Sequence, residues 1–241
     1  GVARDIVAVL NTRNNEKQKI NIPSVDGFKA QDKGSPIEVI VEDNEKCPRF
    51  SGLSIEGLEV KDSPDWLKNS LLAIGIRPVN NVVDITNYVL METGQPLHAY
   101  DISAIKGGKV IVRGANKGEK FTTLYDIERD LSEVDLMICN AEEGMCIAGV
   151  FGGAASGVTE ATRGIFLESA NFDPVSVRKT SRLYGLQTDA SFRFERGADP
   201  NITVYALNRA AMLITEIAGG HISSGVQDHY PREIKNAEIK L

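Results

Sequence analysis

Residues 109–172 restrict the possible folds of this chain more than any other stretch. They hold four short apolar runs, KVIVRGA, KFTTLYD, VDLMICN and GMCIAGVFGG, separated by glycine, asparagine and acidic residues. Runs of this length between turn residues are typical of β-strands. Because no helical period stands between them, regular βαβ alternation is missing and a mostly antiparallel sheet is expected. No GxGxxG motif follows a strand, which argues against a Rossmann fold.

Helices are predicted on both sides of this β-rich stretch, so the expected fold class is α+β. The first helix begins at Ser63 as its cap and Pro64, and its apolar face comprises Trp66, Leu67, Leu71 and Ile74. The second covers about residues 81–93, with Asn81 as cap, Asp84 as capping-box partner, and Gly94 and Pro96 at its end. Its buried stripe is predicted to be Val82, Ile85, Val89 and Leu90.

Two later helices each begin with an Asp-Pro pair, at Asp173 and at Asp199. They are predicted to end at about Leu183 and before Gly219, respectively. The segment between them, LQTDASFRFERGADP, is predicted to be an irregular loop, which is a common site-lining element. Near the N-terminus, DIVAVL and IEVIVED are predicted strands with DKGSP as a turn, and PRFSGLSIEGLEV is a predicted strand pair.

Composition narrows the class of protein. The 241 residues are 42% hydrophobic and 25% charged, which suits a globular chain of one large or two small domains. No apolar run reaches the roughly 18 residues needed to cross a membrane, and no signal peptide is recognised, so a cytoplasmic location is expected. The three cysteines lack a CxxC spacing, so a disulfide scaffold and a zinc site are not expected. Cys139 and Cys146 lie in an apolar, strand-like stretch and are predicted to be buried structural thiols, with a catalytic cysteine as the alternative. A net charge of −6 argues against a general nucleic-acid binder.

Glu168 lies in GIFLESANF (164–172), a predicted strand. Alternation places Ile165 and Leu167 on one face, and Phe166, Glu168 and Ala170 on the other. Glu168 is therefore bracketed by apolar neighbours. Either it points to water at a sheet edge, or it points into a pocket whose ligand donates a hydrogen bond to it.

The stretch RPVNNVVDITNYVLMETGQPLHAYD (77–101) is rich in side chains that form hydrogen bonds. Thr86 and Asn87 either bond a preceding carbonyl or face water, as such residues often do within helices, or they line a cleft together with His98. For His98 the alternative is a satisfied packing histidine. In FGGAASG, Gly152 marks either a turn with positive φ or a place where a ligand approaches the backbone. Spacing alone leaves these alternatives open.

Five basic residues form the densest basic cluster of the chain. They are Arg178, Lys179, Arg182, Arg193 and Arg196. Such a run is usually a solvated face, and it is also the one cluster dense enough to meet a nucleic-acid backbone.

Four motifs together resemble the B3/B4 region of the bacterial phenylalanyl-tRNA synthetase beta subunit. They are CPRFSGL, the 77–101 stretch, IAGVFGGAASGV and the segment FLESANFDPVSVRKTSRLYGLQTDASFRFERGADP. The resemblance covers about residues 47–220. It implies one editing domain over 1–241, with flanking strands at 1–46 and 221–241. The implied fold is a three-layer unit in which helices pack on a β-sandwich of unusual topology.

The resemblance also implies a function: hydrolysis of tyrosine from mischarged phenylalanine tRNA, as part of a longer ligase chain. The implied partners are the 3′ end of that tRNA and the alpha subunit in an alpha2/beta2 heterotetramer. The implied synthetic site, with ATP and magnesium, lies in the alpha subunit, so no cofactor is expected in this region. The alternatives are a non-catalytic structural or tRNA-positioning module, and a free-standing hydrolase acting on mischarged tRNA.

Residue roles follow from the same resemblance. Glu168 is expected to accept the tyrosine phenol, while Gly152 and Ala190 shape the ring slot. His98, Thr86 and Asn87 are expected to position water and the ester, with His98 not an essential base. The remaining matched positions are Arg77, expected at the adenosine or its phosphate, and Thr188. Tyr100 and Phe192 are taken to lie beside the site.

Overall fold

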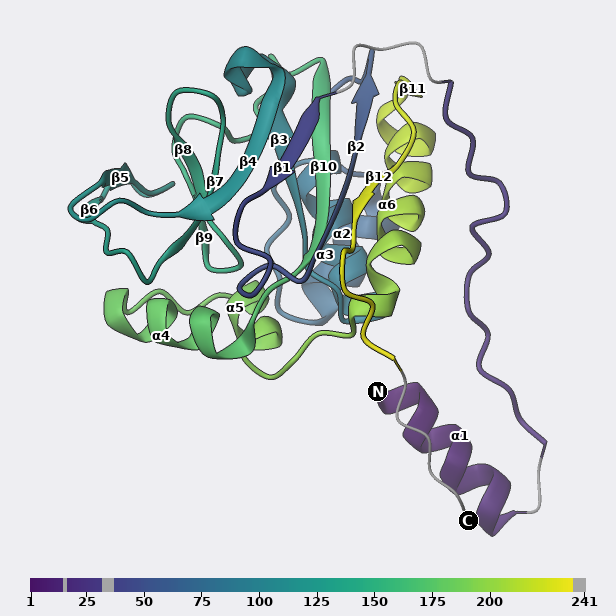
Figure 1. Cartoon of the computed structure of the whole chain (residues 1–241). Coiled ribbons are helices and arrows are strands. Elements are labelled where there is room, and N and C mark those ends of the chain that lie inside the picture. The colour runs from purple at the N-terminus through teal and green to yellow at the C-terminus, as the bar shows by residue number, and fades with distance from the viewer. Residues whose placement is uncertain (15–16, 32–36, 236–241) are drawn as a thin grey trace.

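Strand β10 (Gly164–Asn171) lies at the centre of the molecule in the computed structural model, which describes residues 1–14, 17–31 and 37–235. It pairs antiparallel with β2 (Arg49–Glu56) on one side and with β3 (Leu97–Asp101) on the other. Two short C-terminal strands, β11 (His221–Ile222) and β12 (Gln227–His229), also pair with β2 and complete this sheet. Figure 1 shows β10 between the second sheet and the helical layer.

The second sheet has the strand order β1-β4-β7-β8-β9. Its strands are β1 (Glu38–Val41), β4 (Lys109–Gly114), β7 (Leu136–Cys139), β8 (Gly144–Ile147) and β9 (Phe151–Gly152). Only the β1–β4 pair is parallel, so the expectation of mostly antiparallel pairing is confirmed. A small hairpin of β5 (Lys120–Thr122) and β6 (Glu128–Asp130) extends from it.

Two apolar cores flank β10, one on each face. Phe166 and Ala170 belong to the core between the two sheets, and Ile165 and Leu167 belong to the core between the central sheet and the helices. The predicted alternation along this strand is therefore confirmed. It arises because successive side chains of a strand point to opposite faces.

Three helices cover the outer face of the central sheet: α2 (Asp65–Ala73), α3 (Asn81–Thr93) and α6 (Thr203–Ala218). The predicted stripe of α3 is fully or almost fully buried, and Gly94 ends that helix in the left-handed conformation. Sheet, sheet and helices make three layers. The α+β class and the three-layer arrangement are confirmed.

The N-terminal ends of α2 and α3 differ from the prediction. Asn80, not Asn81, caps α3 by accepting hydrogen bonds from the backbone N–H groups of Val82 and Val83. Asp84 instead accepts from the Ser63 hydroxyl at 2.6 Å, so Ser63 ties the two helices together and does not cap α2. On α2, Leu67 and Leu71 are buried as predicted, but Trp66 and Ile74 are exposed.

Helices α4 (Pro174–Tyr184) and α5 (Asp189–Phe194) lie at one end of the space between the sheets, at the bottom of Figure 1. The start of α4 at Asp173 is as predicted, and its end at Tyr184 lies one residue beyond the predicted Leu183. The loop prediction for residues 186–200 was wrong over α5, because Thr188 and Ser191 form a capping box that nucleates this short helix. A 3₁₀ turn, η3 (Pro200–Ile202), precedes α6. Two others, η1 (Ile102–Ala104) and η2 (Lys106–Gly108), link β3 to β4.

The N-terminal segment contains the largest error of the sequence-based prediction. DIVAVL is not a strand but part of helix α1 (Val2–Arg13), which has no buried residue and projects from the body of the molecule in Figure 1. PRFSGLSIEGLEV holds one strand, β2, instead of a pair. The strand predicted at IEVIVED is present as β1, while the DKGSP turn lies outside the described residues. Within the described ranges, no helix has both the length and the apolar character to span a bilayer.

Candidate functional site

Glu168 is buried between the two sheets, with 5% of its surface exposed. Its register partners on the neighbouring strands are Gly52 on β2 and His98 on β3. Because Gly52 has no side chain, Glu168 has no side-chain neighbour at the paired position on β2. Burial raises the pKa of the Glu168 carboxyl to about 7. Glu168 therefore does not point to water at a sheet edge.

The Tyr100 phenol is the hydrogen-bond partner of Glu168. Its hydroxyl donates to Glu168 Oε2 at 2.6 Å, and Tyr100 itself is fully buried. Burial and the nearby carboxylate hold the pKa of the phenol well above its ordinary value, so the phenol keeps its proton and remains a donor. Glu168 Oε1 accepts no hydrogen bond from any described residue. One carboxylate oxygen is therefore bonded, and the other has no hydrogen-bond partner in the described part of the chain.

His98 lies beside this pair on the same face of β3. Its ring stands edge-on to the Tyr100 ring, with centroids 4.5 Å apart. Burial lowers the pKa of His98 to about 4, so the imidazole is neutral at pH 7. Within the described ranges its two ring nitrogens form no hydrogen bond. His98 is therefore not a packing histidine whose hydrogen bonds are satisfied within the protein. A neutral imidazole with free nitrogens is able to hold a water molecule.

Gly152 faces His98 from the second sheet. A Cβ placed on Gly152 would lie 3.3 Å from His98 Cε1, which is tighter than an ordinary contact. Gly152 does not have a positive φ, so the turn interpretation of this glycine is wrong. The absent side chain instead gives room to the His98 ring.

Thr188 connects this region to α5. Its hydroxyl donates to the backbone oxygen of Val150 at 3.1 Å and accepts from the N–H of Ser191 at 3.0 Å. Val150 is two residues before Gly152, so the start of α5 is fixed to the glycine segment. Ala190, on the first turn of α5, packs against the core between the sheets.

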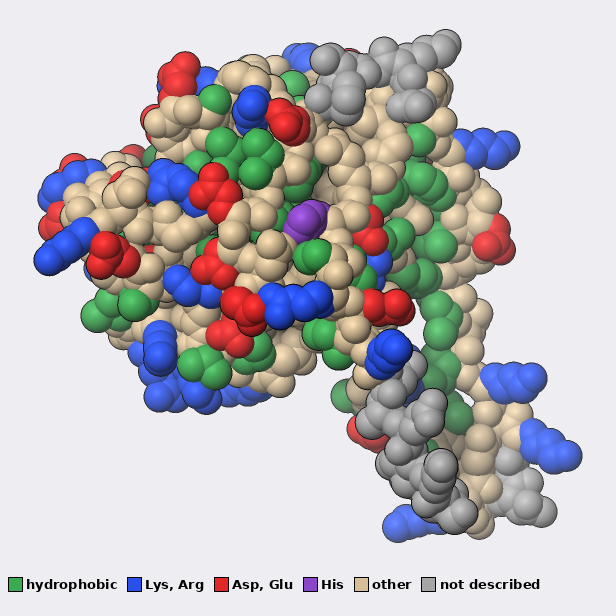
Figure 2. All heavy atoms as spheres, viewed as in Figure 1, with side chains coloured by type: hydrophobic (Ala, Val, Ile, Leu, Met, Phe, Trp, Pro, Cys, Tyr) green, Lys and Arg blue, Asp and Glu red, His purple; other side chains and the backbone are tan. Residues whose placement is uncertain are grey.

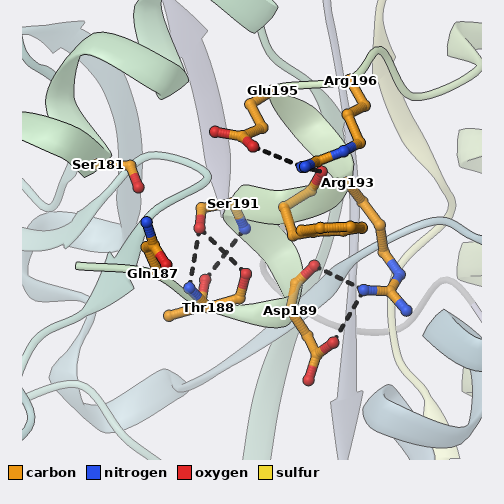
Figure 3. A pocket seen from close by; sticks show the side chains of 9 residues that line it. Ser181, Gln187, Thr188, Asp189, Ser191, Arg193, Glu195 and Arg196 are labelled. Carbon is orange, nitrogen blue, oxygen red and sulfur yellow. Dashed lines mark hydrogen bonds and ion pairs between the residues drawn. The ribbon is translucent and has the colours of Figure 1, made fainter. Parts of the chain in front are cut away.

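A cavity of about 460 Å³ opens at Thr188, lined by residues of α4 and α5. Figure 3 shows the Thr188–Ser191 capping bonds on one side of it and the ion pairs Asp189–Arg193 and Glu195–Arg196 on another. Its lining includes Thr188 but neither Glu168 nor His98. Two of the five basic residues of the cluster, Arg193 and Arg196, are therefore paired with acidic groups. The other three, Arg178, Lys179 and Arg182, form no ion pair among the described residues.

The remaining predicted site residues lie in the helical layer or next to it. The Thr86 hydroxyl donates to the Val83 backbone oxygen at 2.7 Å, which is the bond to a preceding carbonyl that the sequence allowed for. Asn87 is half-buried on α3, and Arg77 is exposed before that helix. Among described residues, no hydrogen bond joins Thr86, Asn87 or Arg77 to Glu168 or His98. The structure therefore brings together Glu168, His98 and Gly152, with Thr188 linked to them through the backbone.

Tyr100 is the contact that sequence reasoning missed, because it was placed beside the site. The available signal was its spacing: two residues after His98 on one strand, it shares the face of His98. Cys146 on β8 faces the same phenol, and burial raises the pKa of its thiol well above the ordinary value. All three cysteines are buried and free, and burial was predicted for Cys139 and Cys146. The described residues contain no cluster of His, Cys, Asp and Glu able to hold a metal ion.

Residues 46–219 match the family described as the B3/4 domain. This chain belongs to that family. The match includes every residue of the cluster just described.

Relatives with curated names are phenylalanine–tRNA ligase beta subunits. This chain is 57% identical over 228 residues to the phenylalanine–tRNA ligase beta subunit of Bacteroides fragilis. That alignment covers 95% of this chain and 28% of the relative. It is 54% identical over 242 residues to that of Porphyromonas gingivalis, covering 100% of the chain and 29% of the relative. The chain therefore spans less than a third of the length of these relatives.

A solved structure has a similar fold. It is an N-terminal fragment of the phenylalanyl-tRNA synthetase beta subunit from Pyrococcus horikoshii, with a TM-score of 0.55 and 18% identity. The alignment covers 80% of this chain and 52% of that fragment. At this identity the similarity supports the fold alone.

Proposed function

We propose that this chain is the editing module of a phenylalanine–tRNA ligase beta subunit, and that it hydrolyses the ester of tyrosine wrongly attached to phenylalanine tRNA. The observation that carries the proposal is Glu168, a buried carboxyl with one oxygen bonded to Tyr100 and the other unpaired. A tyrosine ring entering beside His98 would donate its hydroxyl to that free oxygen. The names of the relatives support the ligase context.

The proposed discrimination follows from the cost of an unpaired buried polar group. A site shaped for phenylalanine rejects an isostere with one added hydroxyl by only about a hundredfold. A site that needs the hydroxyl discriminates more strongly, because a phenylalanine ring leaves the Glu168 oxygen desolvated and without a donor. We assign Gly152 and Ala190 to the walls of the slot for the ring.

Hydrolysis itself needs a placed water and support for the developing oxyanion. The water oxygen attacks the ester carbonyl, and the ribose oxygen of the terminal adenosine leaves and takes up a proton. We assign His98, Thr86 and Asn87 to holding the water and the ester. An imidazole with a pKa of about 4 is a weak base at pH 7, so positioning is the better role for His98 than proton abstraction.

The RNA would lie along the end of the molecule where α4 is found. Arg178, Lys179 and Arg182 are exposed there and lack acidic partners in the described ranges, and Figure 2 shows Lys and Arg side chains gathered at that edge. Phosphate contacts of this kind supply affinity without sequence specificity. Arg77 is assigned to the terminal adenosine or its phosphate. The alpha subunit, in an alpha2/beta2 assembly, would carry the synthetic site with its ATP and magnesium.

One observation favours the alternative of a non-catalytic, tRNA-positioning module. The cavity at α5 is lined by Thr188 but not by Glu168 or His98. A module that only held RNA would use the α4–α5 surface and would leave Glu168 as a structural group.

The deciding experiment compares deacylation of tyrosyl-tRNA and phenylalanyl-tRNA by the complete ligase, wild type against Glu168→Ala. We expect the wild type to clear the tyrosyl ester and spare the phenylalanyl ester, and the variant to lose that preference. Tyrosine and phenylalanine activation at the synthetic site should stay unchanged in both enzymes. Clearance of neither ester by the wild type would establish the non-catalytic alternative.

A further inference from the structure

The Tyr100 hydroxyl is the one hydrogen-bond donor that the described residues offer to the Glu168 carboxyl. Tyr100 is 0% exposed and is held on three sides: by β10 through its register partner Phe166, by the His98 ring at 4.5 Å, and by Cys146 on β8. A phenol held in this way has no route to swing out for an entering ligand. It is a permanent partner of the carboxyl, not a temporary occupant of the site.

We propose that Tyr100 is a specificity-determining residue, which orients Glu168 and favours its ionised form so that a ring carrying a hydroxyl is preferred. The proposal rests on the function proposed above and names the residue that makes that function selective. Through its bond to Oε2, Tyr100 fixes the carboxyl plane and leaves Oε1 as the single acceptor for the substrate.

The charge state of Glu168 is the link between this bond and selectivity. Burial disfavours the carboxylate, whereas the hydrogen bond from Tyr100 favours it and opposes that effect. An ionised Oε1 pays a large desolvation cost beneath a phenylalanine ring, but a protonated carboxyl pays a much smaller one. Removing the phenol hydroxyl therefore lowers selectivity, because a larger fraction of Glu168 is protonated at pH 7.

The other groups that face Glu168 do not replace Tyr100. On β3, His98 is neutral at pH 7 and does not bond the carboxyl. Cys47, before β2, and Cys146, on β8, are buried thiols whose pKa values are raised, so both remain protonated. The paired position on β2 is Gly52. Among the described residues, no cation influences the pKa of Glu168.

The test uses the complete ligase with Tyr100→Phe, which removes one oxygen atom from a fully buried ring. We expect the ratio of tyrosyl to phenylalanyl ester hydrolysis at pH 7 to fall about tenfold or more, as for loss of a charge-assisted hydrogen bond. The pH midpoint of that selectivity should move upward by about one to two units, so that part of the selectivity returns in alkaline buffer. The protonated carboxyl of Glu168 should give an infrared C=O band, absent in Glu168→Gln, which persists to higher pH in Tyr100→Phe than in the wild type.

Tyr184→Phe is the matched control. The Tyr184 hydroxyl also donates to a carboxylate at 2.6 Å, that of Asp135, but it does not contact Glu168 or His98. It should change neither the selectivity nor its pH midpoint. Equal selectivity in Tyr100→Phe and wild type would overturn the role of Tyr100 while leaving the proposed function intact. A wild type that hydrolysed neither ester would overturn both.

Discussion

The two faces of strand β10 bury side chains of different kinds. Toward the helices, Ile165 and Leu167 pack among aliphatic residues of α2, α3 and α6. Toward the second sheet, Glu168 sits between Phe166 and Ala170, with the Tyr100 phenol and the His98 imidazole beside it. One strand thus serves as packing surface on one face and as a polar site on the other.

This difference separates stability from chemistry. Burial of an aliphatic side chain stabilises the fold by an amount roughly proportional to the area removed from water. Burial of a carboxyl and of an imidazole costs free energy unless partners compensate, and here each group is left with an atom that no described residue bonds. Groups kept at such a cost, with perturbed pKa values, are characteristic of functional sites.

The largest expected effect comes from the helix-facing side. Leu167 is fully buried between register partners Leu53 and Ala99. Leu167→Ala should lower the free energy of unfolding by about 4 kcal/mol, because it removes a buried side chain and leaves a cavity. Urea unfolding would measure this. The preference for the tyrosyl ester should persist below the unfolding transition, and a changed preference would mean that the two faces are not independent.

The next effect concerns the site-facing side and depends on pH. The pKa of Glu168 in the folded protein, about 7, lies above its ordinary value of 4.5. Protonation is therefore favoured by folding, and the stability that Glu168 contributes is fully present below pH 4.5 and lost as pH rises through 7. Glu168→Gln cannot ionise, so it should be more stable than the wild type above pH 7, by on the order of 3 kcal/mol, and equal to it near pH 4.

His98 supplies an internal check on that measurement. Its pKa in the folded protein, about 4, lies below the ordinary 6.5, so its contribution is present above pH 6.5 and lost as pH falls through 4. Glu168→Gln should therefore still lose stability in acid. A variant whose stability showed the same pH dependence as the wild type across the whole range would mean that the pKa of Glu168 does not change on folding.

The smallest expected effect tests the fit between the sheets. Gly152→Ala places a methyl group 3.3 Å from His98 Cε1, so the ring must move by a few tenths of an ångström. Stability should change by about 1 kcal/mol or less, while hydrolysis of the tyrosyl ester should fall about tenfold because the imidazole is misplaced. Gly157→Ala is the control in the same segment, since its Cβ would meet only Leu124 at 3.9 Å. Equal rates for both variants would remove His98 from the mechanism.

Local patterns predicted much of the fold. The alternation in β10, the stripe on α3 and the Asp-Pro start of α4 depend on neighbouring residues alone, and all three are present. The strand prediction for DIVAVL failed because it rested on the preference of β-branched residues for strands. In the structure this segment forms α1, which buries none of its residues. The prediction that Asn81 caps α3 was wrong because Asn80, one residue earlier, has the extended backbone that a cap needs.

The candidate site was predictable in its residue types but not in its contacts. Glu168 and His98 come from segments about 70 residues apart, and only the register of β3 against β10 sets them side by side. The same register places the Tyr100 hydroxyl on the carboxyl, although 68 residues separate them in the chain. Thr86 shows the opposite outcome, since its hydroxyl bonds its own helix.

The sequence by itself determined the α+β class, the faces of β10 and the family, because these depend on local periodicity and on motifs that lie along the chain. The tertiary structure alone decided which polar groups meet. Strand pairing and the packing of one sheet on the other bring Glu168, Tyr100, His98 and Gly152 together, with Glu168 and Tyr100 buried and His98 and Gly152 half-buried. Hydrogen bonds and pKa shifts of this size arise from that burial, which no linear pattern specifies.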